Sequence, residues 1–186
     1  MSGTLASPVV IGFGNPLRGD DGVGLRVIDE LRSLAAREPA SLPPGTCLVA
    51  AGSPTLDLLG IIRDAPALLL IDAVDDGRTP GSLEVLRGDR VDATVGRGSI
   101  GDLLVAGRLT GRLPGSISMI GVQVAATEVG LGLSAAVEDA VPAAVRLSQL
   151  ELTRLAAPTA SSANGGPRRA AHPDWRAPQP AGGVYA

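Results

Sequence analysis

Residues 9–24 read VVIGFGNPLRGDDGVG and contain the features that decide the fold. An apolar strand ends in a glycine-rich turn, and the turn delivers two adjacent carboxylates, Asp20 and Asp21, to the start of a helix. Glycine permits positive φ and close backbone approach, but it costs entropy where neither is needed. We therefore expect a site at the carboxyl end of a parallel strand, where open α/β sheets place their ligands. The alternative is a turn in which Asp20 or Asp21 only caps the helix.

Two nucleotide-binding motifs are excluded by the same stretch. A dinucleotide fingerprint beginning Gly12-x-Gly14 requires its third glycine at position 17, which is Leu17. A phosphate-binding loop requires a lysine after the glycines, and the sequence contains none. Two carboxylates in the turn would also repel a pyrophosphate, so a nucleotide is not the expected ligand.

Composition limits the remaining function classes. The 186 residues are 45% hydrophobic and only 2% aromatic, which suits one domain with an aliphatic core. The formal net charge is −3, and three arginines in the last thirty residues make the rest of the chain more negative, which argues against a nucleic-acid surface. We expect no membrane span and a cytoplasmic protein. The single cysteine, Cys47, excludes an intramolecular disulfide and is expected to be a buried strand residue.

Apolar periodicity predicts alternating strands and helices. The expected strands are 8–12, 46–50, 67–73, 82–86 and 116–122, and the expected helices are 21–37, 54–62, 100–107 and 134–155, the last with Ser134 as N-cap. Residues 74–81 are too few for a parallel crossover, so the fourth strand should run antiparallel. We predict a three-layer αβα fold with a mixed, mostly parallel, twisted sheet of about five strands and helices on both faces.

Strand order brings two carboxylates together. In a flavodoxin-like 2-1-3 order the first and third strands are neighbours, so the turn bearing Asp21 lies beside Asp72 at the end of the third strand. Two converging carboxylates can bind a metal ion or share proton transfer. Residues 1–156 are predicted to form this single domain. Residues 157–186 are rich in Pro, Ala and Gly, include His172 and Trp175, and are predicted to be disordered.

The segment 14–24, GNPLRGDDGVG, resembles the N-terminal signature of the hydrogenase maturation proteases. Other elements follow in that family's order. They are Ala51–Pro54, Leu70–Ala73, Pro80–Ser82, Gly121–Gln123 and Gly130–Ser134, so that the resemblance spans about residues 7–155. It implies an endopeptidase that removes the C-terminal extension of a [NiFe] hydrogenase large-subunit precursor after nickel insertion.

The resemblance also implies roles for particular residues. Asp21 and Asp72 match the family's acidic metal-binding positions. Asn15, Asp20 and Gly52 are expected to contact the substrate, although Asn15 can equally hydrogen-bond within the turn. Nickel is expected as a component of the substrate subunit, and no organic cofactor is expected. The resemblance thus implies a metal-binding, aspartic-type endopeptidase. The sequence identifies no side chain as catalytic. Asp20 is equally well explained as a residue that fixes the turn.

One position departs from the family pattern. The metal-binding histidine of the family corresponds to Gly96, and the only histidine of the chain is His172. Two carboxylates alone bind nickel weakly, since this metal favours imidazole. The alternative function is therefore a non-catalytic relative that binds a hydrogenase subunit as an assembly factor.

Overall fold

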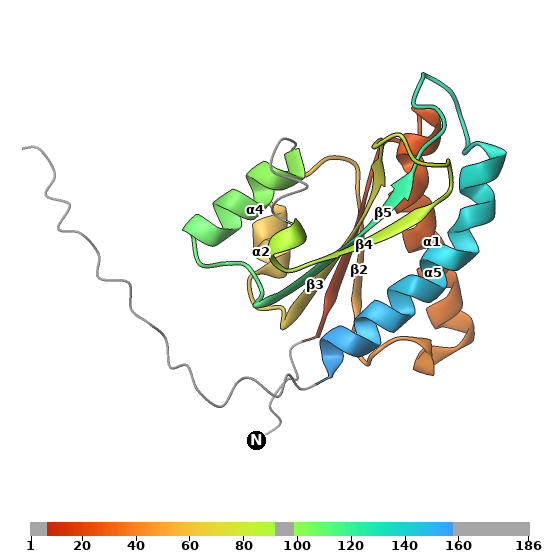
Figure 1. Ribbon diagram of the computed structural model, residues 1–186. Helices are drawn as coiled ribbons and strands as arrows, with labels where there is room; N and C mark the ends of the chain where they lie inside the picture. The colour runs from red at the N-terminus through yellow and green to blue at the C-terminus, as the bar shows by residue number, and fades with distance from the viewer. Residues whose placement is uncertain (1–6, 92–98, 158–186) are drawn as a thin grey trace, which may run out of the picture.

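A computed structural model describes residues 7–91 and 99–157, which form one five-stranded sheet with helices on both faces (Figure 1). The strands are β1 (Val9–Phe13), β2 (Cys47–Ala51), β3 (Ala67–Val74), β4 (Leu83–Arg87) and β5 (Ser116–Gln123). The helices are α1 (Val23–Arg37), α2 (Leu58–Ile62), α4 (Ser99–Leu109) and α5 (Ala135–Ala156), with short 3₁₀ helices η1 (Gly19–Gly22) and η2 (Pro39–Ser41). The αβα fold predicted from the sequence is confirmed.

The sheet has the strand order β2-β1-β3-β5-β4. β1 is parallel to both of its neighbours, so that Ile11 lies beside Val49 of β2 and Leu70 of β3. β3 and β5 are also parallel, whereas β4 is antiparallel to β5, as its short connection predicts. The carboxyl ends of β2, β1 and β3 therefore meet at one edge of the sheet.

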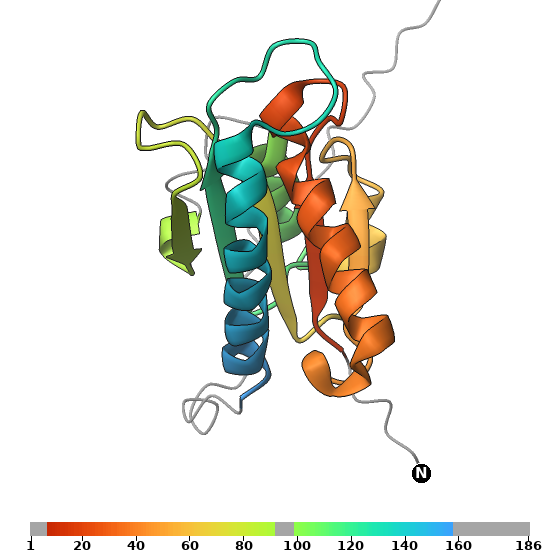
Figure 2. The ribbon, with the colours of Figure 1, turned by 90° about the vertical axis from the view of Figure 1, so that its right-hand side faces the viewer.

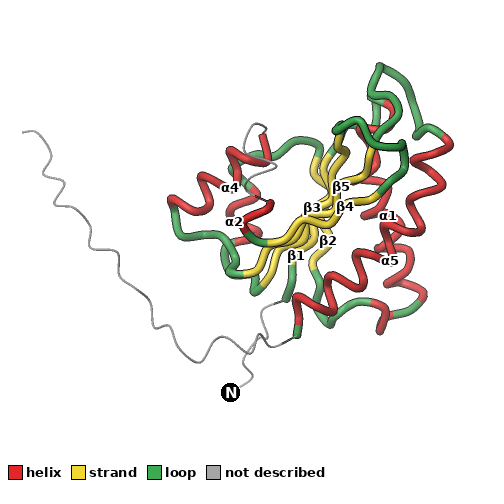
Figure 3. The backbone as a smooth tube through the Cα atoms, in the orientation of Figure 1, coloured by secondary structure: helices red, strands yellow, loops and turns green. Residues whose placement is uncertain are grey.

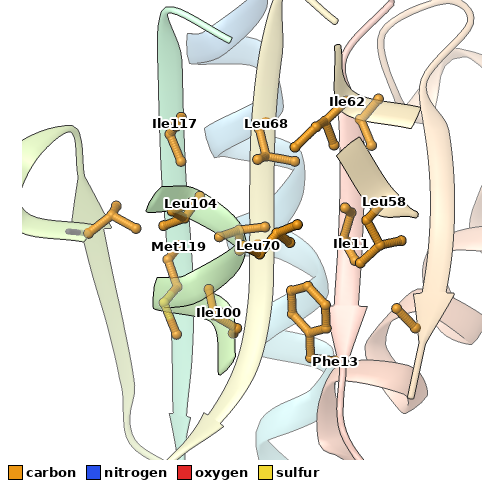
Figure 4. Packing of buried hydrophobic residues seen from close by; sticks show 14 of the residues in the cluster. Ile11, Phe13, Leu58, Ile62, Leu68, Leu70, Ile100, Leu104, Ile117 and Met119 are labelled. Carbon is orange, nitrogen blue, oxygen red and sulfur yellow. The ribbon is translucent and has the colours of Figure 1, made fainter. Parts of the chain in front are cut away.

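Each face of the sheet is covered by two helices. α1 and α5 lie side by side over one face (Figure 2), and α2 and α4 cover the other (Figure 3). The first five residues of the run ALLLIDA in β3 are buried, because Leu68 and Leu70 pack toward α2 and α4 while Leu69 and Ile71 pack toward α1 and α5. The sole phenylalanine, Phe13, completes the first of these clusters with aliphatic residues of both helices (Figure 4).

An ionic cluster ties the antiparallel edge strand to the last helix. The buried carboxylate of Glu151 accepts hydrogen bonds from the guanidinium groups of Arg87 on β4 and Arg154 one turn away. Arg154 also donates to the buried hydroxyl of Ser118 on β5, at 2.8 Å. The hydrogen bond from Arg87 is the main reason that the pKa of Glu151 is lowered despite its burial. The buried charge is thus paired, and it fixes β4 against α5.

Three details differ from the sequence prediction. The first helix begins at Val23 rather than at residue 21, because residues 19–22 form the tighter η1 turn. The second helix covers only Leu58–Ile62, since residues 55–57 form turns. Ser134 does occupy the N-cap position of α5, but its hydroxyl makes no capping hydrogen bond and donates to Asp20 instead.

The prediction of a buried Cys47 is wrong. Cys47 is exposed, because β2 is an edge strand and Cys47 is its first residue. Among the helices of the described residues, none combines the length and apolarity needed to cross a bilayer. The predicted disordered tail lies outside the described residues beyond Ala157, and it stays a prediction.

Helix α1 packs unusually close to the sheet through Gly24. A Cβ added at Gly24 would lie 2.2 Å from the carbonyl oxygen of Phe13 and 2.6 Å from that of Ile71. Both atoms belong to the backbone of sheet strands and have little freedom to move. The glycine therefore sets the distance between α1 and the strands that carry the site.

We expect Gly24→Ala to destabilise the protein by roughly 3 kcal/mol or more, because α1 must shift away from β1 and β3. Gly60→Ala is the matched control, since Gly60 is also helical and a Cβ there meets nothing within 4 Å. That substitution should be neutral or stabilising by less than about 1 kcal/mol. Urea unfolding measures both, and equal stabilities for the two variants would contradict the close-packing argument.

Candidate active site

A polar cleft of about 300 Å³ opens at the carboxyl edge of the sheet. Three segments line it, namely the turn after β1, the turn after β2 and the end of β3. Its lining residues are Phe13, Gly14, Asn15, Arg18, Asp21, Gly52, Ser53, Pro54 and Asp72. The structure thus brings Asn15, Asp21, Gly52 and Asp72 together, as the strand-end argument predicts. Of the predicted site residues, only Asp20 does not line the cleft.

The turn after β1 fixes the position of the Asp21 carboxylate. Its Oδ2 accepts a hydrogen bond of 2.9 Å from the backbone N–H of Asn15. The Asn15 side chain in turn accepts a hydrogen bond from the backbone N–H of Leu17, which closes the turn. Gly14 has a φ of 136°, and a Cβ there would lie 1.8 Å from the carbonyl oxygen of Asp21. Only glycine allows this turn to bring the carboxylate back toward β1.

The carboxyl group of Asp72 has a strongly raised pKa. Burial raises the pKa of its carboxyl group to about 7, and the negative charge of Asp21 adds to the effect, while the backbone N–H of Ala73 opposes it. A carboxyl group with this pKa exchanges a proton readily at neutral pH. Perturbed acids in a cleft are characteristic of catalytic sites.

Asp20 has a structural role next to the cleft. Its side chain is 1% exposed and accepts hydrogen bonds from the backbone N–H groups of Ala125, Ala126 and Ser134 and from the Ser134 hydroxyl, at 2.6–3.1 Å. Burial alone would raise the pKa of Asp20, but these hydrogen bonds outweigh it and lower the pKa. Of the two roles left open by the sequence, the structure therefore supports the turn-fixing role.

Arg18 and Ser53 line the cleft although sequence reasoning did not single them out. The Arg18 Nε donates a weak hydrogen bond of 3.3 Å to the carbonyl oxygen of Thr127. The sequence could have indicated Arg18 as a site residue, because it stands between Asn15 and Asp21 in the glycine-rich turn. Gln123 was also missed, and it is a buried residue that holds the β3–β4 connection, donating to Asp75 and accepting from the backbone N–H of Asp76.

The described residues of the cleft offer only oxygen atoms as metal ligands. Within the described part of the chain, no group of three or more His, Cys, Asp or Glu side chains gathers to hold a metal ion. Asp21 and Asp72 are a pair of carboxylates, and both Gly96 and His172 lie outside the described residues. Two carboxylates can complete the coordination sphere of a metal ion that other ligands already hold, but they bind nickel weakly by themselves.

The family model that describes "Hydrogenase maturation protease" matches residues 26–149. The chain belongs to the hydrogenase maturation protease family. The match begins after residues 9–24, so the glycine-rich turn is a separate observation in favour of the same family. Family membership makes this protein a peptidase, in agreement with a cleft that holds paired carboxylates.

Individual relatives agree with the family model. The chain is 32% identical over 152 residues to the hydrogenase expression/formation protein HupD of Rhodobacter capsulatus, covering 77% of this chain and 70% of the relative. It is 29% identical over 171 residues to the hydrogenase 2 maturation protease of Escherichia coli, covering 88% and 98%. The solved structure of the maturating endopeptidase HybD from Escherichia coli superposes with a TM-score of 0.72 at 25% identity, covering 80% of this chain and 93% of that one.

We expect Asp20→Asn to destabilise the fold at pH 7 by about 3 kcal/mol, because an amide cannot accept from all of these donors. The lowered pKa of Asp20 gives stability that is present above about pH 4 and is lost as the pH falls through the folded-state pKa. The difference from wild type should therefore shrink at pH 3. Urea unfolding at both pH values tests this, with the exposed Asp64→Asn as control.

We expect Asp21→Asn to lower the pKa of Asp72, because it removes the neighbouring negative charge. Carboxyl carbon NMR titration of the folded protein measures the pKa of Asp72, and the control Asp64→Asn should leave that pKa unchanged.

The raised pKa of Asp72 also makes stability depend on pH. Between about pH 4 and pH 7 the native state binds a proton on Asp72 that the unfolded state does not, so wild type loses stability as the pH rises through this range. Asp72→Asn should then be more stable than wild type at pH 8, and the reverse order would contradict the assignment.

Proposed function

We propose that this peptidase removes the C-terminal extension of a [NiFe] hydrogenase large-subunit precursor after nickel has been inserted. The observation that carries the proposal is the cleft in which Asp21 and Asp72 meet, beside Asn15 and Gly52. Membership of the maturation protease family supports a hydrogenase subunit as substrate. The names of relatives such as the Escherichia coli hydrogenase 2 maturation protease support the same class of substrate.

The substrate polypeptide is proposed to cross the cleft over the turn after β2. Gly52 is exposed, and a Cβ there would meet nothing within 4 Å, so a peptide has room to approach its backbone. In the neighbouring turn after β1, the side chain of Asn15 is anchored by the N–H of Leu17 and is therefore held in a fixed orientation. We assign substrate contact to Asn15 and Gly52, and we withdraw Asp20 from that role because its carboxylate is buried and fully engaged.

Nickel enters this proposal as part of the substrate. Among the described residues, two carboxylates leave most of a nickel coordination sphere unfilled, and the proposal takes further ligands from the precursor. Asp21 and Asp72 are the residues proposed to contact the ion. Bound nickel would supply Lewis-acid polarisation of a nearby carbonyl group. Recognition of the loaded precursor then follows, because the carboxylates gain a favourable partner only when nickel is present.

Asp72 is proposed to transfer protons during peptide hydrolysis. Before the ion is bound its pKa lies at about 7, so the group gives up its proton readily at neutral pH when nickel arrives, and its free carboxylate oxygen can then accept a proton from an attacking water molecule and pass it to the leaving amine. Asp21 is proposed to orient that water, since its carboxylate is held by the Asn15 N–H. This division of work between two carboxyl groups is of the aspartic type. The guanidinium of Arg18 lines the same cleft and suits a developing oxyanion.

The non-catalytic assembly factor is the weaker candidate. It was motivated by Gly96 alone, whereas the family and the acidic cleft both favour a peptidase. The cytoplasmic location expected from the sequence stays a prediction.

We expect Asp21→Ala and Asp72→Ala each to reduce processing of a nickel-loaded precursor by about 100-fold or more, because proton transfer and charge stabilisation are worth that much. Gel-shift assays of extension removal measure the rate. Asp64→Ala is the control, since Asp64 is an exposed carboxylate outside the cleft. Processing at the wild-type rate by both cleft variants would refute the carboxylate mechanism.

Nickel recognition is tested in the same assay. The precursor without nickel should remain uncleaved, and Gly96→His should tighten nickel binding measured by calorimetry, because it restores the imidazole that the family uses. Equal cleavage of the two precursor forms would remove nickel from the proposal while leaving the peptidase activity intact.

A further inference from the structure

Three large apolar side chains are strongly exposed beside the cleft. Leu17 is 60% exposed, Val129 is 92% exposed and Leu131 is 84% exposed. Leu17 belongs to the turn after β1, and the other two belong to the loop between β5 and α5. We call these three residues the rim patch. Both segments lie at the same end of the sheet in two perpendicular views (Figures 1 and 2).

The two segments of the rim patch are joined backbone to backbone. Arg18 and Gly130 form a parallel bridge, in which the Gly130 N–H donates to the Leu17 carbonyl and the Gly19 N–H donates to the Gly130 carbonyl, both at 3.0 Å. The buried Asp20 carboxylate binds both ends of the same loop. The apolar side chains are therefore exposed on a well-anchored loop pair. A preorganised surface of this kind loses little entropy when a partner binds.

A small hollow lies next to the rim patch. It has a volume of about 170 Å³, and its walls come from the same two segments and from α1. Its apolar lining includes Pro16, Leu25 and Leu133. The volume is roughly ten times what one water molecule requires, so the hollow can receive an aliphatic side chain.

We propose that the rim patch and this hollow bind apolar side chains of the precursor polypeptide close to the bond that is cleaved. This inference rests on the proposed function. The occupant follows from continuity, because Leu17 stands between Asn15 and Arg18, and both of these line the cleft. Arg18 also forms the backbone bridge to Gly130, which stands between Val129 and Leu131, so a polypeptide bound at Asp21 and Asp72 has the rim patch within reach. The patch supplies affinity, whereas the carboxylates supply chemistry.

The test compares exposed leucines of equal accessibility. Leu131→Ser removes part of the rim patch. Leu109→Ser is the matched control, since Leu109 is also 84% exposed but belongs to α4, on the other face of the sheet from α1 and α5 (Figure 1). We expect Leu131→Ser to raise KM for the precursor about tenfold with kcat unchanged, because the lost contact acts on binding. Leu17→Ser and Val129→Ser should act in the same direction, and Leu109→Ser should leave both constants at wild-type values.

A binding measurement separates this inference from the proposed function. With the nickel-free precursor, which should remain uncleaved, Leu131→Ser should weaken affinity about tenfold relative to wild type by calorimetry. If wild type cleaves the precursor and Leu131→Ser leaves KM and affinity unchanged, the docking inference is overturned. The same holds if the rim variants change only the oligomeric state in light scattering, since the occupant would then be a second copy. If wild type cleaves no nickel-loaded precursor although it binds one through Leu131, the proposed function fails and the docking surface stands.

Discussion

The site depends on the hydrogen bonds that the buried carboxylate of Asp20 accepts. It lies at the junction between the turn after β1 and the loop before α5, and it accepts hydrogen bonds from both ends of that loop. A carboxylate that gathers several N–H donors is stabilised in its charged form, which makes each hydrogen bond stronger than a neutral one. This junction sets the position of η1, and η1 carries Asp21 into the cleft.

Asp20, Asp21 and Asp72 show how environment separates the roles of one residue type. Asp20 is buried but surrounded by donors, so its pKa is lowered and it acts as a structural anion. Asp72 is partly buried with one opposing backbone N–H, so its pKa is raised to about 7. Asp21 stands between them and is oriented by the Asn15 N–H. A stabilised carboxylate thus lies next to the cleft, and a destabilised one lies within it.

The antiparallel edge strand completes the sheet without covering the cleft. β4 pairs only with β5, and the buried Glu151 holds it through Arg87. The cleft lies on the other side of the sheet order, over β1, β2 and β3. Within the described residues, this arrangement keeps β4 away from the strands whose carboxyl ends line the cleft.

Much of the site could be predicted because it follows from local rules. The glycine-rich turn and the apolar run of β3, placed in a flavodoxin-like 2-1-3 order, predicted the convergence of Asp21 and Asp72, and the short connection before β4 predicted its antiparallel direction. The position of β5 between β3 and β4 was not predicted. The sequence could not separate Asp20 from Asp21, since adjacent aspartates look alike until distant donors are known. The partners of Asp20 lie more than a hundred residues away, and so does the loop that carries Val129 and Leu131.

The burial of Cys47 was predicted wrongly for the same reason, because an edge strand differs from a central strand only by its neighbours. The sequence by itself therefore determined which residues lie at the carboxyl ends of which strands. The tertiary structure alone decided which of these side chains are buried, charged and accessible, because burial and hydrogen bonding depend on contacts between residues far apart in the chain.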